Sequence, residues 1–147
     1  MGRGAASRGP ARTSQRTFRL AEGTIRQLDE RARELSESRN ALAQRLLDEA
    51  LRLERHPLIY FREGGAGLRR PALTGTRLYV WQILDTVRAS ESVEEAATFV
   101  GLNERQARAA IAYYADYQDE VDAYAEEERE FARREHERWE RTQQVLG

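Results

Sequence analysis

The alternation of polar and apolar positions predicts one short strand near the start of the chain. In an extended backbone over residues 15–20, Phe18 and Leu20 fall on one side. Gln15, Thr17 and Arg19 fall on the other side. No second strand follows within reach of a hairpin turn, so we expect the strand to pair with the same strand of a second chain, because its backbone N–H and C=O groups need partners.

Two amphipathic helices follow this strand. Apolar residues recur at intervals of three and four over residues 25–35, and again over residues 42–53. Ser38 is positioned as the N-cap of the second helix. The sequence RHP at residues 55–57 ends that helix, because the residue before a proline disfavours the α conformation.

Residues 58–78 have the pattern of a short β-hairpin. The segments LIYF and PALTGTRLYV flank the glycine-rich loop REGGAGLRR. The GGAG sequence at residues 64–67 lacks the Lys-Ser/Thr pair and the helix start that a phosphate-binding loop needs. We therefore interpret it as a hairpin turn.

Helical periodicity then returns in three segments. One helix is predicted over residues 80–90, and a second begins at Ser92, with Glu95 placed to complete a capping box. A third begins at Asn103, and its apolar positions form a continuous stripe as far as Val121. The arrangement of helices and turn is similar to a helix-turn-helix.

The last part of the chain predicts a long, highly charged helix. Its large apolar residues recur only once in seven or eight positions, at Tyr124, Phe131, Trp139 and Leu146. Such a helix buries too little surface to be stable alone, so we expect it to lie in a hydrophobic groove of a partner. The alternative is a frayed, charged extension.

The distribution of charge separates the two ends of the chain. The formal net charge is −1, but residues 1–20 carry five arginines and no acid. Residues 91–147 carry fifteen acids and seven arginines, a net charge of −8. One end therefore favours a polyanion and the other repels it. The negative charge of residues 91–147 argues against a second DNA-reading role for Arg105, Gln106 and Arg108 in the helix-turn-helix-like segment. Packing or dimerisation is the favoured role of that segment.

The residue types argue against catalysis and metal binding. The chain has no cysteine, so it can form neither a disulfide nor a thiolate metal site. His56 and His136 lie far apart, with no catalytic motif around either. We expect no catalytic residue, metal or cofactor. No apolar run approaches the length of a membrane span and no secretion signal is present, so a cytoplasmic protein without membrane contact is expected.

The sequence TFRLAEGTIRQLDERARELSESRNALAQRLLDEAL, residues 17–51, resembles a ribbon-helix-helix domain. The resemblance implies a homodimer whose two-stranded ribbon enters the major groove of operator DNA. By this resemblance the base contacts would be Gln15, Thr17 and Arg19. The phosphate contacts would be Arg12, Arg16, Ser38, Arg39 and Asn40, and the dimer core Phe18, Leu20, Leu42 and Leu46.

Residues 56 to about 120 are similar to a small bacterial family catalogued as domain of unknown function 433. The similarity lies in His56-Pro57, in LTGTRLYV from residue 73, and in SVEEAATFVGLNERQARAAIAYY from residue 92. Members of that family resemble VapB-type antitoxins and are often encoded beside PIN-like ribonuclease toxins. The resemblance implies an antitoxin whose C-terminal arginines neutralise the acidic, magnesium-binding centre of the nuclease. The expected toxin-binding residues are Tyr124, Arg129, Phe131, Arg134, Arg138 and Trp139.

These observations predict a mainly α protein in four parts. They are a basic arm (1–14), a ribbon-helix-helix module (15–55), a hairpin with a helix-turn-helix-like module (56–120) and a charged amphipathic helix (121–147). The expected function is that of an antitoxin, not an enzyme, which binds a PIN-like ribonuclease and represses its own operon. The alternatives are a stand-alone dimeric transcriptional regulator without a toxin, and a scaffold that does not touch DNA.

Overall fold

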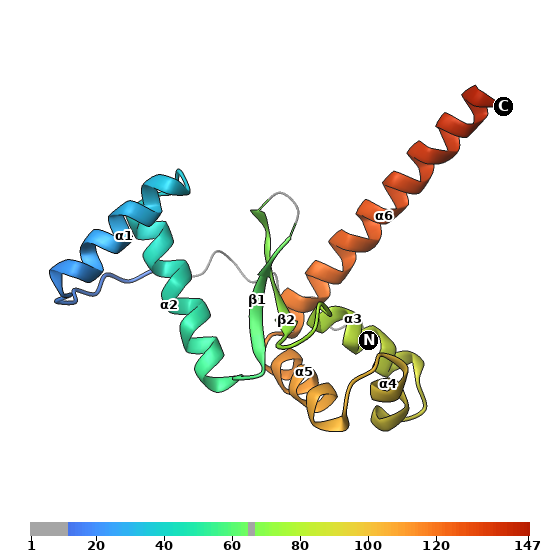
Figure 1. Ribbon diagram of the computed structural model, residues 1–147, viewed down its shortest axis with the longest axis horizontal. Coiled ribbons are helices and arrows are strands. Elements are labelled where there is room, and N and C mark those ends of the chain that lie inside the picture. Colours follow the sequence, from blue (N-terminus) through green and yellow to red (C-terminus); the bar gives the residue numbers. More distant parts are fainter. Residues whose placement is uncertain (1–11, 65–66) are drawn as a thin grey trace, which may run out of the picture. The chain divides into compact units, whose positions relative to one another are not determined.

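The computed structural model describes residues 12–64 and 67–147, and the chain divides into two compact units, residues 1–45 and 46–147 (Figure 1). As predicted, the described part is mainly helical, with one two-stranded antiparallel hairpin and a long C-terminal helix. Most of the expected basic arm, residues 1–14, lies outside the described residues.

The first unit begins with an exposed segment without regular structure. Residues 12–21 form neither strand nor helix within the described part of the chain. Helix α1 (Glu22–Glu34) follows, preceded by Ala21 in an extended conformation. The predicted strand at residues 15–20 is thus not formed with any other segment in residues 12–64 or 67–147, and its pairing between two chains stays a prediction.

A tight turn joins α1 to α2 (Arg39–Arg55). Ser36 adopts the left-handed conformation, with φ of 52°. The Ser38 hydroxyl accepts a hydrogen bond from the backbone N–H of Ala41 at 3.1 Å, which confirms the predicted N-cap. The last turns of α2, from residue 46, belong to the second unit.

The predicted hairpin is formed by β1 (Ile59–Glu63) and β2 (Arg69–Leu73). The strands are antiparallel, with Ile59 opposite Leu73 and Glu63 opposite Arg69. After β2 the chain turns at Gly75, whose φ of 80° suits a residue without a side chain. It then returns so that Tyr79 bridges to Ala72.

Three short helices follow the hairpin, and they are α3 (Val80–Ala89), α4 (Val93–Phe99) and α5 (Glu104–Asp116). The predicted N-caps are present: the Ser92 hydroxyl accepts from the N–H of Glu95 at 3.1 Å. The predicted capping box is not completed there, because the Glu95 carboxylate accepts from the N–H of Glu91 and not from that of Ser92. At α5, the side chains of Asn103 and Gln106 each accept a hydrogen bond from the other residue's backbone N–H, which completes a capping box.

The prediction of one continuous stripe from Asn103 to Val121 was wrong. Helix α5 ends at Asp116, and a separate helix α6 (Gln118–Leu146) of 29 residues begins after Tyr117. Tyr117 has φ of −133° and ψ of 40°, outside the helical region. Because of this break, Tyr113 on α5 and Val121 on α6 both enter the same core.

The core of the second unit joins the hairpin to helices α3, α5 and α6. Its buried members are Ile59, Leu73, Val80, Ile83, Leu84, Ala110, Tyr113 and Val121. The first turns of α6 therefore pack into this core, and the rest of the helix extends away from it (Figure 1).

Candidate functional site

The N-terminal segment presents basic and polar side chains to solvent. The predicted base-contacting residues Gln15, Thr17 and Arg19 are all exposed, and so are Arg12 and Arg16. No acidic residue occurs between positions 12 and 21. The described segment therefore presents positive charge that no acidic residue within it balances.

The start of α2 brings together the residues predicted to hold a phosphate. Ser38 caps the helix and both Arg39 and Asn40 are exposed. The Arg39 guanidinium, however, lies 2.5 Å from the Asp29 carboxylate on α1. A phosphate at this helix end would therefore have to compete with Asp29 for Arg39, whereas Asn40 has no such constraint.

The first unit has very little core of its own. Among its described residues, 12–45, only Ala32 and Leu42 are buried. Phe18 is 70% exposed and Leu20 is 50% exposed. The described part of the first unit therefore leaves a large share of its apolar side chains exposed.

The predicted dimer-core residues fall into two groups. Leu42 is fully buried within the chain, so it supports the first unit and offers no surface to a partner. Phe18, Leu20 and, in the second unit, Leu46 are exposed. Sequence reasoning missed other exposed apolar residues on α1 and α2, namely Ile25, Leu47 and Leu51.

In the second unit, a partly buried polar cluster anchors the base of α6. Arg52 on α2 donates to Glu120 on α6 at 2.5 Å and to the Tyr113 hydroxyl at 3.0 Å. Its guanidinium also lies 4.1 Å from the centre of the Tyr117 ring. Burial alone would lower the pKa of Arg52, but the hydrogen bonds to Glu120 and Tyr113 outweigh it and raise that pKa.

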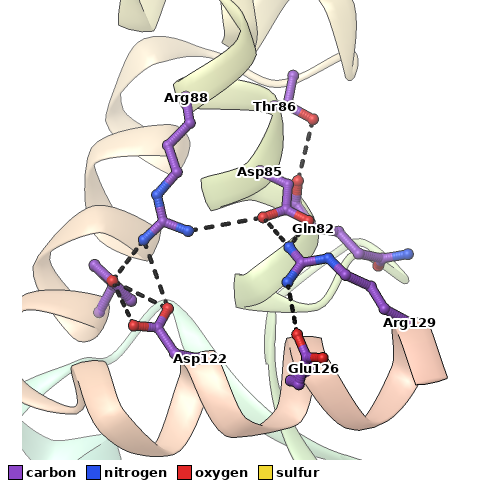
Figure 2. Close-up of polar contacts among 8 residues, drawn as sticks. Gln82, Asp85, Thr86, Arg88, Asp122, Glu126 and Arg129 are labelled. Carbon is purple, nitrogen blue, oxygen red and sulfur yellow. Dashed lines mark hydrogen bonds and ion pairs between the residues drawn. The ribbon is translucent and has the colours of Figure 1, made fainter. Parts of the chain in front are cut away.

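A second ion-pair cluster holds α6 against α3 and α5 (Figure 2). Arg129 on α6 donates to both carboxylate oxygens of Asp85 on α3, at 2.7 and 2.9 Å. Arg88 on α3 lies between Asp85 and Asp122, at 3.7 and 3.5 Å. The hydrogen bond with Asp85 raises the pKa of Arg129.

Hairpin strand β2 contributes a third anchor. Arg70 donates to Glu127 on α6 at 2.6 Å, and its guanidinium lies 3.9 Å from the centre of the Tyr124 ring. Burial, assisted by the charge of Glu120, raises the pKa of Tyr124. Arginines from α2, β2 and α3 thus contact the first three turns of α6.

Because of these contacts, the predicted toxin-binding residues fall into two groups, those that contact the rest of the described chain and those that do not. Tyr124 and Arg129 are engaged within the chain, whereas Phe131, Arg134, Arg138 and Trp139 are exposed. Arg134 pairs with Glu130, one turn earlier on the same helix. The sequence could not reveal the division, because the anchoring arginines lie up to 68 positions from their partners.

The three polar residues of the helix-turn-helix-like segment, Arg105, Gln106 and Arg108, differ in whether they have partners within the described chain. Gln106 belongs to the α5 capping box, and Arg108 pairs with Glu104 at 2.5 Å and with Glu94 at 3.8 Å. A hydrogen bond from its own backbone lowers the pKa of Glu94, with smaller contributions from Ser92 and Arg108. Arg105 is exposed and its guanidinium has no ion pair among the described residues.

Within the described ranges, no group of three or more His, Cys, Asp or Glu side chains is arranged to hold a metal ion. No helix in residues 12–64 or 67–147 has the length and apolar character required to cross a membrane.

Comparison with known proteins gives one match. The model of a family described as "Protein of unknown function (DUF433)" matches residues 68–114. The match runs from just before β2 into α5, and it supports the similarity of the hairpin and helix module to that family. His56 and Pro57 lie outside it. No curated protein and no solved structure matches the chain.

Proposed function

We propose that the protein is a dimeric antitoxin that binds operator DNA through its N-terminal segment and a PIN-like nuclease through the exposed part of α6. The observation that carries the proposal is the exposure of Phe18 and Leu20 on a segment that also presents arginines and has no strand partner in the part of the chain that the structure describes.

Pairing of residues 15–20 from two chains satisfies the backbone groups and buries the apolar side chains in one step. Complete burial of a side chain such as Phe18 or Leu20 contributes about 1.5–3 kcal/mol. The opposite face of the ribbon then displays Gln15, Thr17 and Arg19 twice. A two-stranded ribbon fits the major groove, where arginine recognises guanine and glutamine recognises adenine.

The toxin-binding surface is the distal α6 segment, residues 131–146. Phe131 is 60% exposed and Trp139 is 58% exposed. Together with Leu146 they follow at intervals of eight and seven residues, which places them along one face of the helix. Arg134 and Arg138 border this face. An amphipathic helix of this kind fits a hydrophobic groove, and its arginines complement the acidic centre of a nuclease.

A single set of purified proteins tests both activities. The full chain, a PIN-like nuclease encoded beside its gene and the DNA upstream of that gene are to be combined, and nuclease activity and DNA binding are measured. We expect Phe131→Ala with Trp139→Ala to relieve inhibition of the nuclease without weakening DNA binding. The matched control is Glu137→Ala, which changes an exposed residue on the opposite face of the same segment.

Two results would reject the proposal. If the double variant inhibits the nuclease as well as the wild-type protein does, the distal α6 segment is not the inhibitory element. If the wild-type protein inhibits nothing and binds DNA, the stand-alone regulator is the better description.

A further inference from the structure

A pocket of about 220 Å³ lies in the second unit, where the end of α2 and the start of β1 meet α5. The α2–β1 connection lines it with the five residues from Arg55 to Ile59. Helix α5 contributes Arg105, Ala109 and Ala112, which lie on one face because they are spaced four and three residues apart.

The charged groups around the pocket are mostly positive. The guanidinium groups of Arg55 and Arg105 line it, and the carboxylate of Asp116 at the end of α5 lies near the Arg55 side of the lining. Asp116 already contacts His56 Nε2 at 2.8 Å, and it lies 4.0 Å from Arg55. Arg105 has no ion pair in the described part of the chain. The lining therefore has more positive than negative charge.

The remaining walls are apolar. Pro57, Leu58 and Ile59 form one side, and the methyl groups of Ala109 and Ala112 form the other. The two alanines keep the pocket open, because a larger side chain at either position would extend into it. A ligand with a fully hydrated surface, such as free phosphate, would gain little from such walls.

We propose that this pocket binds a carboxylate group attached to a small apolar body. The guanidinium groups of Arg55 and Arg105 hold the carboxylate, for which arginine provides paired N–H donors. The apolar walls hold the attached body. A short organic acid and the C-terminal residue of a peptide both have this chemistry. The proposal does not depend on the antitoxin function.

Binding is tested on the full chain with benzoate as the probe, by calorimetry and by NMR shifts of the pocket residues. Benzamide, which has the same shape without the charge, is the control ligand. We expect saturable binding of benzoate and at least tenfold weaker binding of benzamide. Equal binding of the two ligands, or no binding of benzoate, overturns the proposal.

Matched substitutions locate the site. Arg105→Gln should weaken benzoate binding by about tenfold or more, since it removes a charged donor. Arg108→Gln on the same helix, which does not line the pocket, should leave binding unchanged. Ala112→Leu should block the pocket, whereas Ala115→Leu, also exposed on α5, should not. Unchanged binding in both Arg105→Gln and Ala112→Leu, with melting curves that show folded proteins, overturns the assignment.

The two sources of the carboxylate are separated by a second probe. N-acetyl-phenylalanine presents a free C-terminal carboxylate, and its amide is the neutral control. If both N-acetyl-phenylalanine and benzoate bind, each tested separately, the result supports recognition of a peptide end. Binding of benzoate alone supports a small organic acid.

Discussion

Arg52 on α2 and Glu120 on α6 form an ion pair at 2.5 Å, although 68 positions separate them in the sequence. The Arg52 side chain is only 15% exposed, and its guanidinium also donates to the Tyr113 hydroxyl. The base of α6 is therefore held by an ion pair to a largely buried guanidinium, which also lies 3.1 Å from the Asp48 carboxylate on α2.

Loss of this ion pair should destabilise the second unit. In Glu120→Gln the amide accepts fewer and weaker hydrogen bonds from Arg52, whose charge stays in a largely buried position. We expect the free energy of unfolding to fall by about 1–2 kcal/mol, because Glu120 is partly exposed. Urea denaturation measures the change. Glu128→Gln, on an exposed position of the same helix, is the control, and an equal change in both variants would show that the pair has no special importance.

Tyr113 should make stability fall at alkaline pH. Its burial raises the pKa of its hydroxyl to about 12, with Arg52 acting in the opposite direction. The unfolded chain ionises at about pH 10. Stability is therefore complete below about pH 10 and is lost progressively as the pH rises towards about 12. Denaturation midpoints across this range should fall less steeply in Tyr113→Phe than in the wild-type protein.

The same substitution has an effect at neutral pH. Removal of the Tyr113 hydroxyl takes one acceptor from Arg52, so Tyr113→Phe should lower the free energy of unfolding by about 0.5–1.5 kcal/mol. The residual alkaline slope in this variant comes from Tyr114 and Tyr124, since burial raises the pKa of each of these hydroxyls too. An alkaline slope identical to that of the wild-type protein would contradict the role assigned to Tyr113.

The Arg129–Asp85 pair should respond to salt, in contrast to the Arg52–Glu120 pair. Both partners are exposed enough for ions to screen them. Arg129→Gln should therefore increase hydrogen exchange of α6 amides near residue 129 at low ionic strength. The increase should disappear at about 1 M salt, because the screening length there is about 3 Å. An increase that persists at high salt would mean that packing, not charge, holds this turn.

The sequence patterns predicted the helices, the hairpin and the helix caps better than they predicted the contacts between these elements. The Ser38 and Asn103 caps and the hairpin follow from residue types within a few positions of one another. The break at Tyr117 was missed, because the apolar spacing continues across it. The engagement of Arg129 by Asp85 was also missed, since it depends on how α3 and α6 pack, and no spacing along the chain encodes that.

The pocket residues were partly visible in the sequence. The sequence predicted that a helix ends at His56-Pro57. It also placed Arg105 in the helix-turn-helix-like segment. Their juxtaposition depends on the packing of β1 against α5. Exposure of Leu47 and Leu51 was missed for a related reason: helical periodicity shows that a face is apolar, but it does not show what covers that face.

Arg19 and Arg16 should affect DNA binding differently. Arg19 is predicted to contact a base, so Arg19→Ala should weaken binding to the operator by about 1–3 kcal/mol and reduce discrimination against unrelated DNA. Arg16 is predicted to contact a phosphate, so Arg16→Ala should weaken binding to both DNAs equally and reduce the salt dependence. Fluorescence anisotropy with the two DNAs measures both effects. Equal loss of discrimination in the two variants would refute the assigned roles.

Sedimentation equilibrium tests the proposed pairing of two chains through a ribbon built from residues 15–20. The account predicts a mass of about twice 16.9 kDa for the wild-type protein and 16.9 kDa for Phe18→Asp, which places a charge where two chains meet. Leu68→Asp, at an exposed apolar residue of the hairpin loop, should stay dimeric. A wild-type monomer at concentrations that bind DNA, or an unchanged dimer in Phe18→Asp, would contradict the account.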